Sequence, residues 1–281
     1  FEQQKEQALS VLSSLSDFVK EGCDLGIQLH PELAEKLRKS VESASDQKLK
    51  VALIGGVAEG KTSIAAAWLE ELDSKSMNIS QQESSSEVAI YNFKDQLQII
   101  DTPGLFGFKE KTNASTEQIE KYKDITKRYV SEAHLVLYVM NSTNPIKESH
   151  AEDLKWLFRT LNLLPRTVFV LSRFDEVADM SDQAEFREKY LIKKTSVLKR
   201  LTDVLELTSE EQSDATIVAV SANPFDMGVE HWLRNLDDFR NLSRIGELQT
   251  ATQKKLESNG GLLALANETK KTIISDVITK H

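Results

Sequence analysis

The sequence predicts an α/β fold whose sheet is mixed but mostly parallel, with further helices at both ends of the chain. Three observations favour this fold class. Short strand-like segments alternate with helical segments through the middle of the chain, a glycine-rich turn joins the first of these strands to a helix, and both ends show helical periodicity. The composition of the 281 residues, 40% hydrophobic and 28% charged, is typical of a folded globular protein.

Residues 1–47 are expected to form two helices ahead of the α/β region. Apolar residues recur at helical spacing over residues 1–22, and we expect this helix to end at Gly22. A second helix is predicted to start near Pro31, because proline at a helix start loses no hydrogen bond. Neither segment carries chemistry that we can identify, so both are interpreted as a helical element outside the core.

Six strand candidates define the core, which we expect to span residues 48–241. Each is a short run rich in β-branched and aromatic residues, and helical segments separate most of them. This alternation predicts a largely parallel sheet covered on both faces. The strand candidates cover residues 49–54, 87–93, 98–100, 135–140, 167–171 and 216–220. The helix candidates cover residues 63–72, 115–133, 151–161, 183–205 and 229–239.

The last part of the chain, residues 242–281, is again helical in pattern. One helix is predicted over residues 243–256, the glycines of 259–261 interrupt it, and an apolar stripe resumes over residues 262–278. We therefore expect three parts, which are N-terminal helices, an α/β core and C-terminal helices.

Charge and cysteine content exclude several classes of protein. The 35 basic and 44 acidic residues give a formal net charge of −9, whereas a nucleic-acid partner needs a basic surface, so we expect none. The single cysteine, Cys23, excludes an intrachain disulfide and a multi-cysteine zinc site. No apolar run approaches the ~20 residues that span a bilayer, and no signal-peptide layout is present. We expect a cytoplasmic protein with at most peripheral membrane contact.

The segment GGVAEGKT, residues 55–62, matches the phosphate-binding pattern G-x-x-x-x-G-K-[ST]. Glycines let the backbone curl so that its amides face phosphate oxygens, and the following helix adds the positive end of its dipole. In this pattern the lysine, here Lys61, reaches the β- and γ-phosphates, and the hydroxyl of Thr62 binds Mg²⁺. The loop residues predicted to contact a nucleotide are Gly55, Glu59, Gly60, Lys61, Thr62 and Ser63.

A second motif, IIDTPG, ends a later strand candidate. Asp101 would stand at the carboxyl end of a core strand beside the phosphate loop, where it can hold Mg²⁺ through water. Gly104 can offer its amide to a γ-phosphate, a contact that is lost with a diphosphate, so the loop that follows is a candidate switch. We predict Lys61, Thr62, Asp101 and Gly104 as the catalytic set, with Thr62 and Asp101 as the metal ligands.

A weakened form of the [NT]-K-x-D guanine motif, SRFD, follows another predicted strand. The carboxylate of Asp175 can accept from N1–H and the 2-amino group of guanine, donors that adenine lacks there. Arg173 can lie along the base, and Ser172, shorter than the usual asparagine, is expected to brace the phosphate loop less well. After the last strand comes the segment Ser221-Ala222-Asn223, where a backbone amide can donate to guanine O6, and Ser221 and Ala222 are the predicted contacts. These residues complete the predicted nucleotide contacts.

These motifs in this order resemble those of Ras-like P-loop GTPases. With helices on both sides of the G domain, the whole chain resembles the dynamin superfamily, most closely bacterial dynamin-like proteins of the LeoA type. The resemblance implies GTP and GDP as ligands, Mg²⁺ as cofactor, and GTP hydrolysis coupled to pairing of two G domains and to membrane remodelling or vesicle release. It also implies that the terminal helices form a neck, and that membrane contact is made by a stalk and tip absent from these 281 residues.

Three positions depart from the family pattern. Dynamins carry glutamine and serine in the phosphate loop where this chain has Val57 and Ala58, and many signalling GTPases carry glutamine where this chain has Leu105. None of these three side chains can position the attacking water. We therefore expect slow intrinsic hydrolysis, with the missing groups supplied by a partner, the backbone or Glu59.

The first switch and the use of the nucleotide stay open. Ser85 is a candidate Mg²⁺ ligand, as are its neighbours Ser84 and Ser86, and a solvated loop fits this stretch equally well. An alternative function is a nucleotide-gated binding module, in which GTP occupancy rather than turnover carries the signal. ATP remains a second possible nucleotide.

Overall fold

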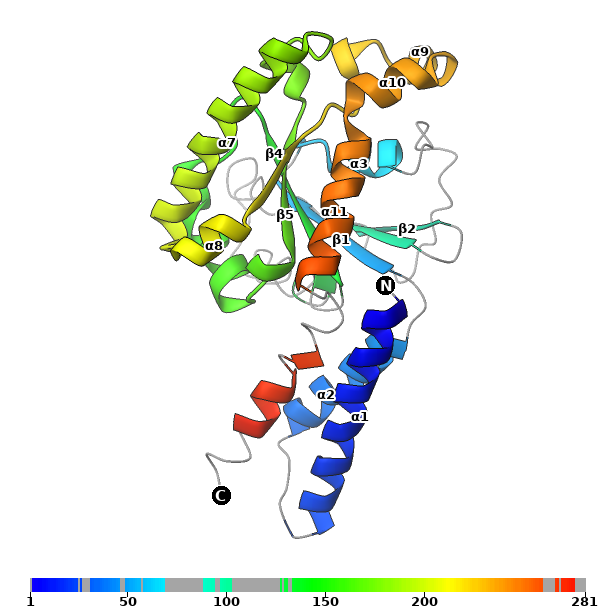
Figure 1. Ribbon diagram of the computed structural model, residues 1–281, viewed down its shortest axis with the longest axis vertical. Coiled ribbons are helices and arrows are strands. Elements are labelled where there is room, and N and C mark those ends of the chain that lie inside the picture. Colours follow the sequence, from blue (N-terminus) through cyan, green and yellow to red (C-terminus); the bar gives the residue numbers. More distant parts are fainter. Residues whose placement is uncertain are drawn as a thin grey trace, which may run out of the picture.

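In the computed structural model, the centre of the molecule is a six-stranded sheet in the order β2-β3-β1-β4-β5-β6 (Figure 1). β2 is antiparallel to β3 and all other neighbours are parallel, so the predicted fold class is confirmed. The strands are β1 (Leu49–Gly55), β2 (Ala89–Phe93), β3 (Leu97–Asp101), β4 (Leu135–Asn141), β5 (Thr167–Ser172) and β6 (Thr216–Ala219). The structure describes residues 2–24, 26, 31–45, 49–56, 58–68, 88–93, 97–102, 127, 129–130, 133–259, 266–267 and 269–275.

Helices cover both faces of the sheet, as the strand sequences require. Side chains alternate along β1, so Ala52 and Ile54 pack with one group of helices while Val51 and Leu53 pack with another. The first group is α6 (Ala151–Lys155) and α7 (Gln183–Leu205). The second group is α3 (Lys61–Trp68), α9 (Val229–Arg234), α10 (Leu236–Ser243) and α11 (Ile245–Asn259). Burial on both faces explains why β1 and β4 read as continuous apolar runs.

The parallel strands bring several sequence motifs to one edge of the sheet. The register pairs Leu53 with Asp101, Gly55 with Val139, and Asn141 with Ser172. The carboxyl ends of β1, β3, β4 and β5 therefore meet, and ligands of open α/β sheets bind at such an edge.

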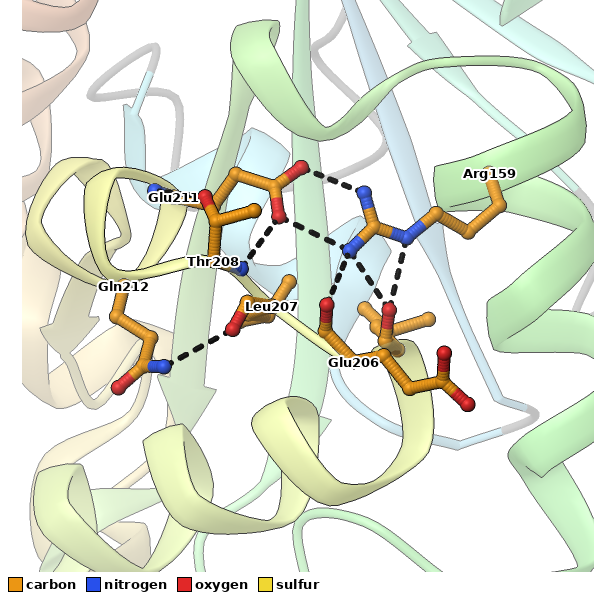
Figure 2. A network of polar contacts seen from close by, with 7 residues as sticks. Arg159, Glu206, Leu207, Thr208, Glu211 and Gln212 are labelled. Atoms are coloured by element: carbon orange, nitrogen blue, oxygen red, sulfur yellow. Dashed lines mark hydrogen bonds and ion pairs between the residues drawn. The ribbon is translucent and has the colours of Figure 1, made fainter.

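A network of hydrogen bonds supplies donors to the carbonyl groups at the C-terminal end of α7 (Figure 2). Arg159, in the π-helical turn η2 (Trp156–Thr160), donates from Nε and Nη2 to the carbonyl oxygen of Leu205 at 2.9 and 2.7 Å. It also donates from Nη1 to the carboxylate of Glu211 at 2.5 Å, and Glu211 forms a capping box with Thr208 at the start of α8 (Ser209–Asp214). Carbonyl groups at the end of a helix otherwise lack hydrogen-bond partners within that helix. The network therefore connects the end of α7 to the start of α8.

The terminal helices form a cluster of their own. α1 (Glu2–Asp24) and α2 (Pro31–Ser45) lie beside the C-terminal helical segment, below the α/β part in Figure 1. Leu12, Leu37 and Ile273 are buried together there. The hydroxyls of Ser40 and Thr269 also hydrogen-bond at 2.7 Å inside the cluster. The contact joins residues that are far apart in sequence, as a neck built from both ends of the chain would require.

Several helix predictions need correction. α1 continues through Gly22 to Asp24, because one glycine costs a helix only about 1 kcal/mol. The helix predicted over residues 229–239 is two helices, since Asn235 leaves the helical region with φ −133° and ψ 53°. α8 has no buried residue, so apolar periodicity does not predict it. Of the helix predicted over 115–133, residues 127, 129 and 130 are helical, and most of the remainder lies outside the described residues.

α11 packs against one face of the sheet. Its residues Leu248 and Ala251 pack in the same apolar cluster as Val51 and Leu53 of β1. The boundaries expected after residues 47 and 241, between the terminal helices and the α/β core, stay predictions.

Across the described part of the chain, no helix combines the length and apolar character needed to cross a membrane.

Candidate nucleotide-binding site

The predicted phosphate loop connects β1 to α3 at the carboxyl edge of the sheet. Only glycine fits at Gly55, because a Cβ there would lie 2.2 Å from the carbonyl oxygen of Val139 on β4. Ala58 and Gly60 have φ angles of 62° and 88°, so the chain enters the left-handed region twice before α3 begins. The resulting curl ahead of a helix is the backbone geometry that binds phosphate.

Lys61 is the first residue of α3, and its amine folds back over the loop. Nζ donates to the carbonyl oxygens of Gly56 at 2.8 Å and Gly55 at 3.3 Å. Burial lowers the pKa of Lys61, and the carboxylates of Asp101 and Glu59 oppose that shift. An ammonium group has three donors, so a phosphate oxygen can take the third without displacing the side chain.

The predicted metal ligands are in contact. Thr62 Oγ1 donates to Asp101 Oδ2 at 2.5 Å, next to the end of β1. Burial raises the pKa of Asp101, while the Thr62 hydroxyl and the Lys61 charge lower it. The other carboxylate oxygen, Oδ1, is buried and finds no hydrogen-bond partner within the described residues. A hydroxyl beside an unsatisfied carboxylate oxygen is a donor set that fits a hard cation such as Mg²⁺.

Glu59 is the acidic residue of the phosphate loop itself. Its side chain lies against Gly56, where a Cβ would be 3.1 Å from Cγ and Oε1 of Glu59. Burial raises the pKa of Glu59, and the Asn141 amide together with the charges of Lys147, Lys61 and Arg173 lowers it. Oε2 is buried and unpaired within the part of the chain that is described. Burial therefore disfavours the ionised form of Glu59.

Replacing Glu59 with glutamine is expected to raise the melting temperature of the nucleotide-free protein at pH 8 by about 2–4 °C, the shift that ~1 kcal/mol produces at this chain size. Because the folded pKa is raised, the protonated form favours folding, and stability is lost as pH rises through the folded pKa. The gain should therefore shrink as the pH approaches ~4.3, the value in unfolded peptides. Melting curves from pH 5 to 8 measure it, with Glu188→Gln as an exposed control. A gain that is independent of pH would contradict this account.

Ser172 braces the phosphate loop, contrary to the expectation from its length. Its Oγ contacts the carbonyl oxygens of Glu59 at 2.6 Å and Met140 at 3.1 Å. The short side chain suffices because the phosphate loop lies close to the end of β5, where even a Cβ on Gly60 would be in ordinary van der Waals contact with Ser172 at 3.8 Å. Sequence alone does not reveal this close approach.

A cavity of about 310 Å³ lies beside the loop, where a base and ribose would be bound. It brings together residues from the phosphate loop and from the ends of β5 and β6. The predicted contacts that line it are Gly60, Ser63, Ser172, Arg173, Asp175, Ser221 and Ala222.

Asp175 reaches this cavity from a well-anchored turn. Phe174 is buried, and its N–H donates to the carbonyl oxygen of Val220 at 3.1 Å, which ties the turn to the end of β6. Asp175 Oδ2 accepts from the N–H of Phe225 at 2.9 Å. Arg173 is exposed, has φ 51°, and lies 3.6 Å from Glu176 in an ion pair. The carboxylate predicted to read the base is therefore held from the other side of the cavity.

The loop after β6 differs in detail from the prediction. The N–H of Ser221 donates to the carbonyl oxygen of Ser243 at 3.0 Å, so the backbone amides of Ala222 and Asn223 remain the candidates for a contact with a base. Asn223 and Asp226 also line the cavity, although the predicted set omits them. The sequence NPFDMG contains the turn-forming residues that could have indicated their role.

Several predicted residues cannot be placed. Gly104 of the catalytic set and Ser85, the candidate first-switch ligand, lie outside the described residues. The same holds for Val57 and Leu105, at two of the departures from the family pattern.

Two family profiles match the chain. Residues 50–173 match the family described as 50S ribosome-binding GTPase, and residues 207–281 match the dynamin-like helical domain. No curated protein matches the chain.

Solved structures add a similarity over the full chain. The LeoA bacterial dynamin GTPase from ETEC is 35% identical with a TM-score of 0.71, over 100% of this chain and 48% of that one. This chain thus spans about half the length of that protein. An oligomerised bacterial dynamin pair, described as a mechanism for the long-range sensing and tethering of membranes, is 16% identical with a TM-score of 0.49, over 99% of this chain and 56% of that one. Toc33 from Arabidopsis thaliana, in complex with Mg²⁺ and GMPPNP, is 16% identical with a TM-score of 0.46, over 69% of this chain and 80% of that one.

Proposed function

Because the chain belongs to the bacterial dynamin-like GTPases, we propose that it binds GTP with Mg²⁺, hydrolyses it, and couples nucleotide state to membrane remodelling or vesicle release. One juxtaposition supports this proposal above all others. The buried amine of Lys61, the Thr62–Asp101 pair and the cavity reached by Asp175 lie around one phosphate loop. That edge of the sheet can receive the phosphates, the metal and the base of one nucleotide.

Each group has a distinct role in the proposed reaction. Lys61 and the loop amides would hold the β- and γ-phosphates. Thr62 and Asp101 would hold Mg²⁺, which when bound would neutralise negative charge on the phosphate oxygens. Asp175 accepts from the two donors on the guanine edge, whereas an adenine nucleotide would offer its carboxylate neither of these donors. Gly104 stays a candidate for sensing the γ-phosphate.

Slow intrinsic hydrolysis is part of the proposal. Ala58 is exposed in the loop and has only a methyl side chain, so it cannot orient water or hold a charge-compensating cation. Each missing electrostatic group costs ~10²–10³ in rate. Single-turnover GTP hydrolysis at nanomolar protein measures this deficit, and rapid turnover by the dilute monomer would overturn it.

Nucleotide-dependent pairing of G domains is the second element of the proposal. A homodimer could supply in trans the groups that the isolated loop lacks, and the cluster of terminal helices could transmit the change to a membrane-contacting part outside this chain. The acidic net charge of −9 disfavours a nucleic-acid partner.

Light scattering in GDP, in a non-hydrolysable GTP analogue and in a transition-state mimic tests this pairing. We expect the mass to double with the transition-state mimic, and turnover to rise with protein concentration. Unchanged mass together with tight GTP binding would favour the alternative, a nucleotide-gated binding module, which the missing polar side chain at Ala58 also suits. Competition between GTP and ATP decides the identity of the nucleotide.

A further inference from the structure

The loop after β6 holds an unusual backbone conformation beside the base cavity. Phe225 has φ 56° and ψ 20°, and Asp226 has φ 53°, so two consecutive residues other than glycine adopt the left-handed region. Such conformations are strained and persist only when surrounding contacts determine them. The contacts that hold this loop therefore identify its role.

Asn223 provides those contacts with both ends of its amide. Its Oδ1 accepts from the N–H of Gly228 at 2.9 Å, and its Nδ2 donates to Oδ1 of Asp226 at 2.8 Å. The backbone adds a bond from the N–H of Asp226 to the carbonyl oxygen of Asn223 at 3.0 Å. One side chain thus spans the loop and closes it on itself.

The closed loop points one backbone donor at the predicted base-reading residue. The N–H of Phe225 donates to Asp175 Oδ2 at 2.9 Å, across a sequence separation of 50 residues. Asn223, Asp226 and Asp175 all line the same cavity. A hydrogen bond to one oxygen fixes the orientation of the carboxylate plane. Guanine can donate from both of its groups at once only when that plane is aligned with the edge of the base.

We propose that Asn223 is a positioning residue for guanine recognition: it holds the loop so that the Phe225 N–H orients the carboxylate of Asp175. The inference rests on the proposed binding of guanine nucleotide at this site. The Asn223 side chain, as distinct from its backbone amide, acts through the loop and through Asp175 rather than by reading the base. Its loss should therefore reduce selectivity among bases more than general affinity for diphosphates.

The test compares the affinities for GDP and inosine diphosphate, which lacks the 2-amino group. Asn223→Ala should weaken GDP binding more than inosine diphosphate binding and lower the preference for GDP by about tenfold, the effect of roughly one charge-assisted hydrogen bond. Inosine diphosphate offers Asp175 one donor fewer, so misalignment of the carboxylate costs it less. Competition titrations in Mg²⁺ measure both constants.

A swapped pair provides a rescue that a merely structural role would not predict. Asn223→Asp alone brings two carboxylates together and should lower the preference as alanine does. Combining it with Asp226→Asn reverses the donor and acceptor of the 2.8 Å bond and keeps an acceptor for Gly228, so the preference should return to within about twofold. Because each member of the swap is polar and similar in size, this comparison is available even if the alanine variant does not fold.

Asn235→Ala is the matched control. Asn235 donates from Nδ2 to the carbonyl oxygen of His231 at 2.8 Å and is not part of the cavity lining, so its loss should leave the preference unchanged. Equal weakening of both nucleotides in Asn223→Ala, or a double variant that stays as unselective as Asn223→Asp, would overturn the inference. If the unaltered chain prefers GDP and Asp175→Ala abolishes that preference while Asn223→Ala does not, only this inference fails. If the unaltered chain binds no guanine nucleotide, the proposed function itself fails.

Discussion

Replacing Lys61 with alanine is expected to weaken GTP binding by about 10- to 100-fold and to lower turnover by a further ~10²–10³-fold. The larger loss falls on turnover because charge on the transferring phosphate is stabilised most in the transition state. Lys61 is buried, and its amine is held at the loop 2.8 Å from the carbonyl oxygen of Gly56. A charge held in place beside the phosphate position is preorganised, and preorganised groups stabilise a transition state most strongly. Isothermal titration and single-turnover hydrolysis measure the two losses separately.

Lys255 supplies a matched control for this variant. It is also a buried lysine whose pKa is lowered by burial, and its Nζ donates to the carbonyl oxygen of Asp214 at 2.9 Å. It lies on α11, outside the lining of the base cavity. Lys255→Ala should change stability but leave nucleotide affinity unaltered. Unchanged GTP affinity in Lys61→Ala, with the variant folded, would refute the assignment of the phosphate loop.

Replacing Asp175 with asparagine is expected to exchange the preferred base from guanine to xanthine. The carboxylate accepts from N1–H and the 2-amino group of guanine, whereas an amide can accept from N1–H and donate to the 2-carbonyl oxygen of xanthine. The variant loses the hydrogen bond to the 2-amino group of guanine and gains one to the 2-carbonyl oxygen of xanthine, at ~1–3 kcal/mol each. The ratio of the affinities for GDP and xanthosine diphosphate should therefore shift by about 10²–10⁴-fold. Competition binding with both diphosphates gives this ratio directly.

Asp179→Asn serves as the control for this exchange. Asp179 is an exposed aspartate near Asp175 in sequence, its Oδ1 accepts from the amide of Ser181 at 2.8 Å, and it does not line the cavity. It should keep the unaltered preference for guanine. If Asp175→Asn weakened both diphosphates equally, the base would be read elsewhere, and a function based on guanine selectivity would lose its main support.

The parts of the fold that could be predicted are those with local signals. Short runs rich in β-branched and aromatic residues located all six strands, and β4, which is buried along nearly its whole length, reads as a continuous apolar run. The helix predicted over residues 183–205 is confirmed to the residue as α7. The glycine spacing located the phosphate loop, because Gly55 and Gly60 occupy positions where a side chain would clash or strain the backbone.

Errors arose where the determining contact is distant or polar. α8 is fixed by its capping box rather than by apolar burial. The break at Asn235 depends on its backbone angles, which propensity does not specify. Ser172 appeared too short for its role because the distance from Ser172 to Glu59 in the loop is set by the fold, across 113 residues of sequence. Length of side chain alone could not decide that contact.

By itself, the sequence determined the class of the fold, the phosphate loop and the family of GTPases, because these depend on periodicity and on short motifs with strict steric requirements. Only the tertiary structure decided that Thr62 meets Asp101, that Ser172 braces the loop, and that the Phe225 amide holds Asp175. The physical reason is that a hydrogen bond depends on tenths of an ångström and on direction. Strand register and loop conformation set those quantities, and both arise from packing across the whole domain.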